Sequence, residues 1–227
     1  MPTNKLIRIG TRNSALAMWQ ARHIADMLAS AGYSVEIVDI ITIGDKILDR
    51  SLSKIGAKGV FTEELETMLR NGEIDIAQHS AKDLPSTLAE DLPLIAFTKR
   101  EAAHDVVLSL NPDFRLASLE GAVVGTSSTR RRAMMAKEFP HHSLVEMRGN
   151  LQTRLEKLKS GTCDAMILAY AGVHRMGMES YIVEHLPIET FTPAVGQGSV
   201  AIQSSSSLDP ALSAAIRKLC NDDATEA

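Results

Sequence analysis

The segment 125–132, GTSSTRRR, combines residue types that together bind negatively charged groups. Glycine lets the backbone turn sharply, and hydroxyl groups and free backbone N–H groups at a helix start bind anions. Arginine binds a carboxylate or a phosphate through two parallel hydrogen bonds. A solvated basic helix start would have the same composition, so this segment alone leaves both interpretations open.

Similar clusters recur along the chain, and each follows an apolar run that is typical of a buried strand. They are residues 11–14 after the run 6–9, 79–83 after 74–77, 126–131 after 122–124, 148–150 after 143–147 with Arg154 one helical turn later, and Arg175 after 165–169. Scattered surface charge would not follow strand ends in this regular way. The sequence therefore predicts a cleft, lined by cations and helix N-termini, that binds a ligand with several negative groups.

Asp83 is the acidic residue of one of these basic clusters. A carboxylate there is either a counter-ion of Lys82 or Arg12 or a catalytic group, and the sequence leaves both interpretations open. His79 is better explained as a packed or hydrogen-bonded side chain than as a catalyst. The sequence has no Walker loop, no serine-protease triad pattern and no metal-ligand spacing, so we expect no metal site.

Composition narrows the classes of function. The chain has 227 residues, of which 44% are hydrophobic, 23% are charged and 4% are aromatic, and its net charge is −4. The few aromatic residues and the acidic balance argue against a nucleic-acid partner. No apolar segment approaches the length of a membrane span, and the first ten residues lack the apolar stretch of a signal peptide. Cys163 and Cys220 form no disulfide or metal-binding pattern, and we therefore expect a cytoplasmic protein.

Strands alternate with helices in two successive runs that join near residues 99–104. The expected strands are 6–9, 35–43, 74–77 and 92–98, then 105–110, 122–125, 143–147, 165–169 and 200–203; the expected helices are 13–30, about 61–69, 130–138, about 151–158 and 210–219. Residues 44–59 lack periodicity and are expected to form a mobile loop. This alternation predicts an α/β protein with two similar domains, mostly parallel sheets and an interdomain cleft that holds the ligand.

Eight stretches together resemble the porphobilinogen deaminases, also called hydroxymethylbilane synthases. They are RIGTRNSALAMWQA, TIGD, SKIGAKGVFTEELE, DIAQHSAKDLP, GTSSTRRR, RGNLQTRLEKL, DAMILAYAGVHRMG and TPAVGQG, and they extend from about residue 7 to about residue 200. The resemblance implies a transferase that joins four porphobilinogen molecules, with loss of ammonia, into the linear tetrapyrrole of haem and porphyrin biosynthesis. It also implies two domains like periplasmic binding proteins and a third domain whose cysteine carries a dipyrromethane cofactor.

The resemblance also assigns roles to residues of this chain. Asp83 would be the catalytic group that stabilises a cation on the pyrrole nitrogen and helps to move protons, Gln197 would lie near the interdomain hinge, and Lys54 and Lys58 would lie in a lid. The side chains that would bind the carboxylates of the substrate and the cofactor are Arg12, Ser14, Lys82, Thr126, Ser127, Ser128, Arg130, Arg131, Arg148, Arg154 and Arg175.

The same resemblance divides the chain into domain 1, residues 1–98 and 197–217, and domain 2, residues 99–196. Residues 218–227 would be the stub of a third domain, most of which this chain lacks. Neither Cys163 nor Cys220 matches the cysteine that carries the cofactor, and both are expected to be buried or idle thiols. Two functions therefore remain open. One is a monomeric transferase acting on porphobilinogen, with the activity of the truncated chain undecided; the other is a catalytically inactive two-domain module that binds a polycarboxylate or another anion.

Overall fold

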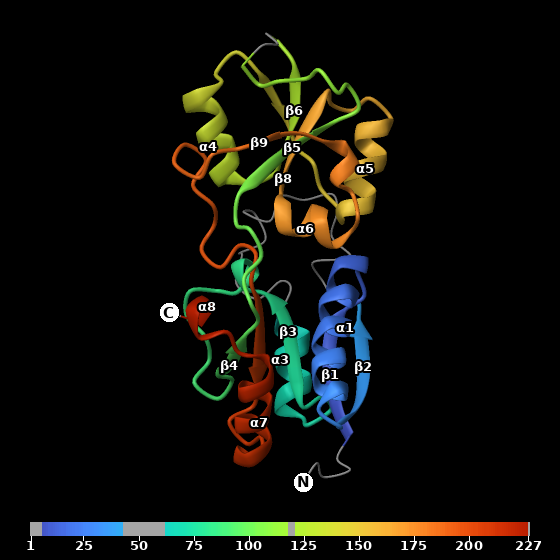
Figure 1. Cartoon of the computed structure of the whole chain (residues 1–227), viewed down its shortest axis with the longest axis vertical. Coiled ribbons are helices and arrows are strands. Elements are labelled where there is room, and N and C mark those ends of the chain that lie inside the picture. Colours follow the sequence, from blue (N-terminus) through green and yellow to red (C-terminus); the bar gives the residue numbers. More distant parts are fainter. Residues whose placement is uncertain (1–5, 43–61, 118–120, 227) are drawn as a thin grey trace. The chain divides into compact units, whose positions relative to one another are not determined.

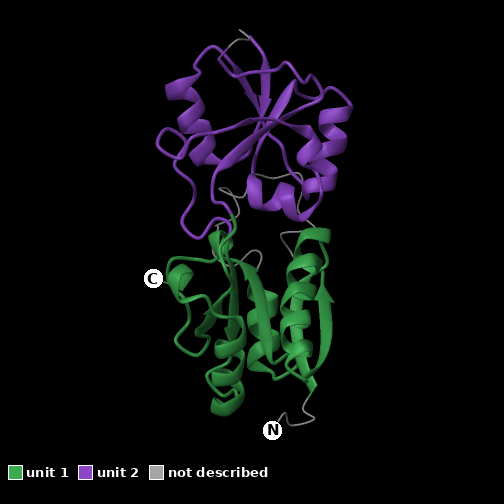
Figure 2. Cartoon of the chain, in the orientation of Figure 1, with its two compact units in different colours: residues 1–101, 199–227 green, residues 102–198 purple. Residues whose placement is uncertain are grey.

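The computed structural model describes residues 6–42, 62–117 and 121–226. The chain divides into two compact units, coloured separately in Figure 2. Unit 1 consists of residues 1–101 and 199–227, and unit 2 of residues 102–198. Residues 218–226 belong to unit 1, and the stub of a third domain stays a prediction.

Unit 1 is built on a mixed sheet whose five strands, counted over the described residues, have the order β2-β1-β3-β10-β4 (Figure 1). The strands are β1 (Leu6–Arg12), β2 (Ser34–Ile40), β3 (Ile76–Ser80), β4 (Leu94–Phe97) and β10 (Val200–Ser204). β1 pairs in parallel with β2 and β3, whereas β10 pairs antiparallel with β3 and β4. Four of these five strands therefore point the same way, and β10 is reversed.

Helices cover both faces of this sheet. On one face, α1 (Ala15–Ser30) and α7 (Pro210–Cys220) bury Ile24, Leu28 and Ile216 against the strands. On the other face, α3 (Glu63–Arg70) packs Leu65 and Leu69 against the sheet in a second apolar cluster. A short helix, α8 (Asp223–Glu226), follows α7. Because both faces are covered, the inner strands β3 and β10 are buried almost throughout. The edge strand β2 instead has exposed polar residues at Ser34, Glu36 and Asp39.

Unit 2 repeats this plan with the strand order β7-β6-β8-β5-β9 (Figure 1). Its strands are β5 (Asp105–Ser109), β6 (Val123–Gly125), β7 (Ser143–Val145), β8 (Ala165–Ala169) and β9 (Ile182–His185). β6 pairs in parallel with β7 and β8, and β5 pairs antiparallel with β8 and β9. Again four of the five described strands share one direction, and the reversed strand is β5.

Two apolar clusters cover the faces of the second sheet. One contains Val107, Ile167 and Met135 of α4 (Thr129–Glu138). The other contains Val106, Leu168 and residues of α5 (Leu151–Lys159) and α6 (Tyr170–Arg175). Neighbouring residues of β5 and β8 enter different clusters, because successive side chains of a strand point to opposite faces.

The predicted α/β class with two similar, mostly parallel sheets is confirmed. The strand expected at 74–77 instead begins at Ile76 and continues to Ser80. The sequence analysis missed α6 and β9, which are only six and four residues long, too short for periodicity to show. The loop expected at 44–59 lies outside the described residues.

In the part of the chain that the structure describes, no helix combines the length and the apolar character that a membrane span requires. There is also no group of three or more His, Cys, Asp or Glu side chains in it that could hold a metal ion.

Candidate functional site

In unit 1, two of the predicted clusters lie at the same edge of the sheet. Arg12 is the last residue of β1, and the short 3₁₀ helix Ala81–Asp83 follows directly after β3. β1 and β3 run in parallel and pair with each other, so their carboxyl ends meet at one edge. Ser14 is the N-cap of α1, and its hydroxyl accepts a hydrogen bond from the Ala17 N–H at 3.3 Å.

A pocket opens among these strand ends and encloses about 450 Å³ of empty space, part of it open solvent. It is lined by Arg12, Ser14, Leu16, Ala17, Gln20, Thr62, Gln78, His79, Ser80 and Asp83. Three of the predicted site residues, Arg12, Ser14 and Asp83, therefore share one pocket. Lys82 is exposed and is not part of its lining. Lys54 and Lys58 lie outside the described residues.

Uncharged polar side chains complete the wall of this pocket. The Gln20 amide donates to the Ser80 hydroxyl at 3.0 Å. The Gln78 amide donates to the Ala17 carbonyl at 3.2 Å, and its Oε1 is buried without a partner. The sequence analysis missed Gln20 and Gln78, because an amide within a helix or strand carries no pattern that marks a site.

In unit 2, the hydroxyl residues after β6 organise the local backbone. Thr126 accepts a hydrogen bond from the Ser128 N–H at 3.3 Å, and Ser127 accepts one from the Met147 N–H at 2.9 Å. Ser128 is the N-cap of α4 and accepts from the Arg131 N–H at 3.4 Å. Thr126 is buried, whereas Ser127 is exposed. These hydroxyl groups thus fix the turn from which α4 begins.

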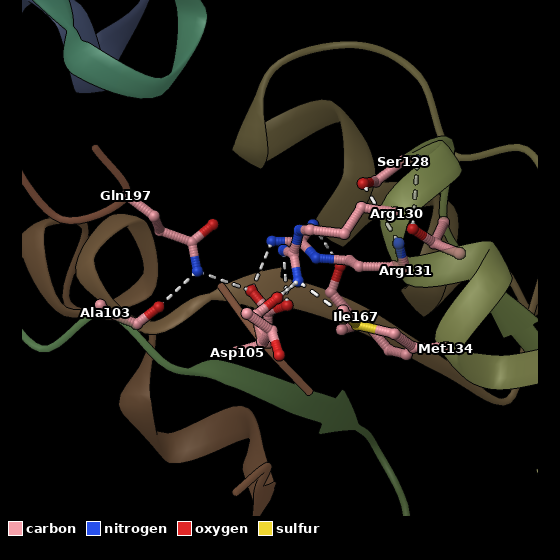
Figure 3. A network of polar contacts seen from close by, with 10 residues as sticks. Ala103, Asp105, Ser128, Arg130, Arg131, Met134, Ile167 and Gln197 are labelled. Carbon is pink, nitrogen blue, oxygen red and sulfur yellow. Dashed lines mark hydrogen bonds and ion pairs between the residues drawn. The ribbon is translucent and has the colours of Figure 1, made fainter. Parts of the chain in front are cut away.

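The arginines that begin α4 bind an internal carboxylate (Figure 3). Arg130 donates to Asp105 Oδ2 at 2.7 Å and to the Thr192 carbonyl at 2.6 Å. Arg131 donates to Asp105 Oδ1 at 2.8 Å and to the Ile167 carbonyl at 3.0 Å. The Asp105 side chain is 0% exposed and that of Arg131 7%, against 21% for Arg130. Arg130 and Arg131, which were predicted to bind carboxylates of a ligand, thus already bind a carboxylate within the protein.

Asp105 also connects this network to Gln197. The Gln197 amide donates to Asp105 Oδ1 at 2.8 Å and to the Ala103 carbonyl (Figure 3). Burial, the largest single influence, raises the pKa of Asp105, but the charges and hydrogen bonds of Arg131 and Arg130 outweigh it, so that this pKa lies below its ordinary value. Residues 103–105 and Gln197 lie next to the two unit boundaries, so this amide ties together the two segments of unit 2 that lead to unit 1.

The sequence analysis missed Asp105 as a site residue. Its position at the start of a strand gave one signal, because a carboxylate there needs a cationic partner once it is buried. The partners themselves lie 25 and 26 residues away, and sequence spacing did not reveal them.

The remaining predicted arginines follow β7 and β8 at the same edge of the sheet, since both strands run parallel to β6. Arg148 has no hydrogen bond or ion pair from its guanidinium within the described part of the chain, and it is half-buried. Arg154 donates to the Gly149 carbonyl at 2.8 Å, and Arg175 donates to the Gly198 carbonyl at 2.7 Å. Within unit 2, the predicted anion-binding residues thus gather at the carboxyl ends of three parallel strands.

Both cysteines are buried free thiols, as expected. Burial raises the pKa of Cys163 to about 11 and that of Cys220 to about 12. A thiol with so high a pKa stays protonated near neutral pH and is a weak nucleophile. The structure therefore offers neither cysteine as an attachment point for a cofactor.

The amino-acid sequence of this chain is similar to those of known proteins of one family. The family profile described as "Porphobilinogen deaminase, dipyromethane cofactor binding domain" matches residues 7–212. A porphobilinogen deaminase of Cytophaga hutchinsonii is 55% identical over 98% of this chain and 72% of its own length. Another, from Desulfosudis oleivorans, is 49% identical over 97% of this chain and 71% of its own length. The chain thus spans about seven tenths of these relatives.

Solved structures similar to this chain support the predicted fold. The VFT2 domain of Bordetella pertussis BvgS has a TM-score of 0.56 at 15% identity, covering 94% of this chain and 86% of that structure. A methionine-binding lipoprotein of Bacillus subtilis, described as putative, has a TM-score of 0.56 at 11% identity, covering 97% and 92%. These likenesses concern the fold alone and confirm that it is of the periplasmic-binding-protein type. Family membership is shown by the profile and by the sequence relatives: this chain belongs to the porphobilinogen deaminase family.

Proposed function

We propose that this protein is a hydroxymethylbilane synthase that condenses four porphobilinogen molecules, with loss of ammonia, into a linear tetrapyrrole. The observation that carries the proposal is the pocket of unit 1, where Asp83 lies at the end of β3 together with Arg12 and Ser14. An exposed carboxylate beside cationic groups suits a reaction that develops positive charge on a substrate held by its carboxylates.

In this proposal, one set of residues binds the carboxylates of the substrate, and Asp83 acts on its reacting pyrrole. The acetate and propionate groups of the pyrroles are held by guanidinium, ammonium and hydroxyl groups at strand ends. Asp83 stabilises the cation that forms on the pyrrole when the C–N bond to ammonia breaks, and it accepts or returns protons as the new C–C bond forms. Arg148 is available to bind a carboxylate of the substrate, because its guanidinium has no partner within the described residues.

Arg130 and Arg131 are proposed to bind carboxylates through the N–H groups that Asp105 leaves unused. Of the two, Arg130 is the more accessible, with 21% of its side chain exposed against 7% for Arg131. Arg12, Ser14, Lys82, Thr126, Ser127, Ser128, Arg154 and Arg175 complete the proposed carboxylate-binding set, Gln197 is the proposed hinge residue, and Lys54 and Lys58 are the proposed lid. These assignments rest on the family resemblance and on the gathering of the described residues at strand ends.

A dipyrromethane cofactor fits the described residues of unit 2, where unpaired Arg148 lies at the same sheet edge as Arg154, Thr126 and Ser127. When bound, this group supplies the free α-position at which the first substrate pyrrole is added. The residues at that edge would hold its carboxylates and fix its orientation. We further propose a cytoplasmic location, which agrees with two free, buried thiols, and a monomeric state, which the family resemblance implies.

The test is ammonia release from porphobilinogen by the wild-type chain and by Asp83→Asn, with Asp26→Asn on the exposed face of α1 as the matched control. We expect Asp83→Asn to reduce turnover by about 100-fold or more, whereas Asp26→Asn behaves like the wild type. Thermal unfolding and porphobilinogen binding should be the same for all three proteins.

Two outcomes would contradict the proposal. If Asp83→Asn unfolds the protein, Asp83 is a structural counter-ion of Arg12 or Lys82. If the wild-type chain binds polycarboxylates but releases no ammonia from porphobilinogen, the chain is an anion-binding module without this activity.

A further inference from the structure

His79 lies in β3 and is held from one side by Gln203 of β10. Its Nε2 is 3.0 Å from Gln203 Oε1, and the Gln203 amide nitrogen donates to the Leu92 carbonyl at 3.0 Å. Gln203 is 0% exposed and His79 6%. Both side chains are therefore fixed in a buried network that involves no charged group.

This network determines which nitrogen of His79 carries the proton. A carbonyl oxygen can only accept, so the Gln203 atom that faces Leu92 must be the amide nitrogen, and the atom that faces His79 must be the oxygen. His79 Nε2 must then be the donor. In the neutral ring, Nδ1 is consequently an unprotonated acceptor.

The neutral ring is also the favoured form. Burial lowers the pKa of His79 to about 4, against the opposing effect of the Gln203 hydrogen bond, and the positive charge of Arg12 lowers it further. His79 Nδ1 thus stays an uncharged acceptor near neutral pH.

The surroundings of this acceptor indicate what it faces. His79 lines the pocket together with Arg12 and Asp83, and its Nδ1 makes no hydrogen bond within the described part of the chain. Two other lining residues, Thr62 and Gln78, contain a buried oxygen without a partner. Buried polar atoms normally have hydrogen-bond partners, so these two oxygens, beside the acceptor nitrogen of His79, indicate a ligand with polar hydrogens.

Resting on the proposed function, we propose that His79 Nδ1 accepts a hydrogen bond from an N–H group of porphobilinogen, and that Gln203 is the positioning residue that fixes the required tautomer. The carboxylates of the substrate cannot donate a hydrogen bond near neutral pH, so an acceptor selects its nitrogen-bearing side. Arg12 attracts the carboxylates in the same pocket. The two groups together would set the direction in which a pyrrole enters beside Asp83.

The test uses the full 227-residue chain labelled with ¹⁵N, and it reads the two ring nitrogens of His79 from long-range ¹H–¹⁵N spectra at pH 7. His79→Asn identifies the signals. We expect a protonated Nε2 and an unprotonated Nδ1, and a shift at Nδ1 alone when porphobilinogen is added. Gln203→Leu should remove the tautomer preference and weaken porphobilinogen binding about 3- to 10-fold, whereas the exposed control Gln152→Leu should change neither.

The outcomes separate this inference from the proposed function. A ring that is protonated on Nδ1 at pH 7 overturns the inference before any ligand is added, and it does so even if Gln203→Leu fails to fold. Porphobilinogen that binds to the wild-type chain without affecting Nδ1 overturns the inference and leaves the proposed function standing. No binding of porphobilinogen to the wild-type chain overturns both.

Discussion

Asp105 is a fully buried carboxylate that receives hydrogen bonds from three side chains: Arg130, Arg131 and Gln197. Removing one member of a buried ion pair leaves an uncompensated charge, and this costs more than the pair itself contributes. The network also orients the two guanidinium groups that are proposed to bind substrate. Asp105 thus orients two proposed substrate-binding arginines, although it does not belong to the basic clusters from which the sequence predicted the site.

We predict that Asp105→Asn lowers the free energy of unfolding by about 3–5 kcal/mol, as measured by chemical denaturation at pH 7. The matched control is Asp91→Asn, which removes an exposed pair with Arg70 and should have little effect on the free energy of unfolding. Because the pKa of Asp105 is lowered in the folded state, its contribution to stability is present above the ordinary pKa of about 4 and is lost as the pH falls below it. An equal effect of the two substitutions would refute this account.

The turn between β7 and α5 shows how an element positions a site residue. Gly149 has a φ of +102°, and Asn150 caps α5 by accepting from the Thr153 N–H at 2.9 Å. A Cβ built on Gly149 would lie 2.8 Å from Thr153 Cγ2, closer than real contacts allow. Glycine is therefore required where the chain passes from Arg148 to Arg154, and its carbonyl accepts from the Arg154 guanidinium.

We predict that Gly149→Ala destabilises the protein by about 2–3 kcal/mol, because left-handed backbone strain and a steric clash act together. Gly161→Ala is the matched control, since Gly161 has a φ of +75° with open space around its Cβ position. This control should cost only about 1 kcal/mol. Thermal unfolding of both variants measures the difference, and similar melting temperatures would show that the contact with Thr153 has no role.

At the scale of the whole molecule, each unit has its own sheet, its own apolar clusters and its own acid-sensitive group. In unit 1, the pKa of His79 is lowered to about 4 by burial. A base with a lowered pKa contributes stability above its ordinary pKa of about 6.5, and this contribution is lost as the pH falls toward the folded value. In unit 2, the pKa of Asp105 is lowered, so its contribution to stability is lost only below about pH 4.

Between pH 7 and pH 5 we therefore expect unit 1 to lose more stability than unit 2. Hydrogen exchange followed by mass spectrometry, corrected for intrinsic exchange rates, reports the protection of each unit separately. His79→Gln should reduce the pH dependence of unit 1 and leave that of unit 2 unchanged. Earlier loss of protection in unit 2 would contradict the assignment.

Local patterns in the sequence determined the α/β class, the order of most elements and the placement of charged clusters after strand ends. These features depend on side-chain periodicity and on capping residues close to each other in the chain, such as Ser14 and Ser128. Parallel pairing then brought the clusters within each unit to one sheet edge. The family could also be identified from motifs that are continuous in sequence.

Only the tertiary structure decided how these residues are partnered. His79 meets Gln203 across 124 positions, Gln197 meets Asp105 across 92, and Arg131 meets Asp105 across 26. Burial then sets the charge of each group, because desolvation and the nearest partner together determine which protonation state is favoured. The sequence placed His79 and the arginines near a site, but their proton positions and the internal carboxylate follow from contacts that exist only after the sheets have formed.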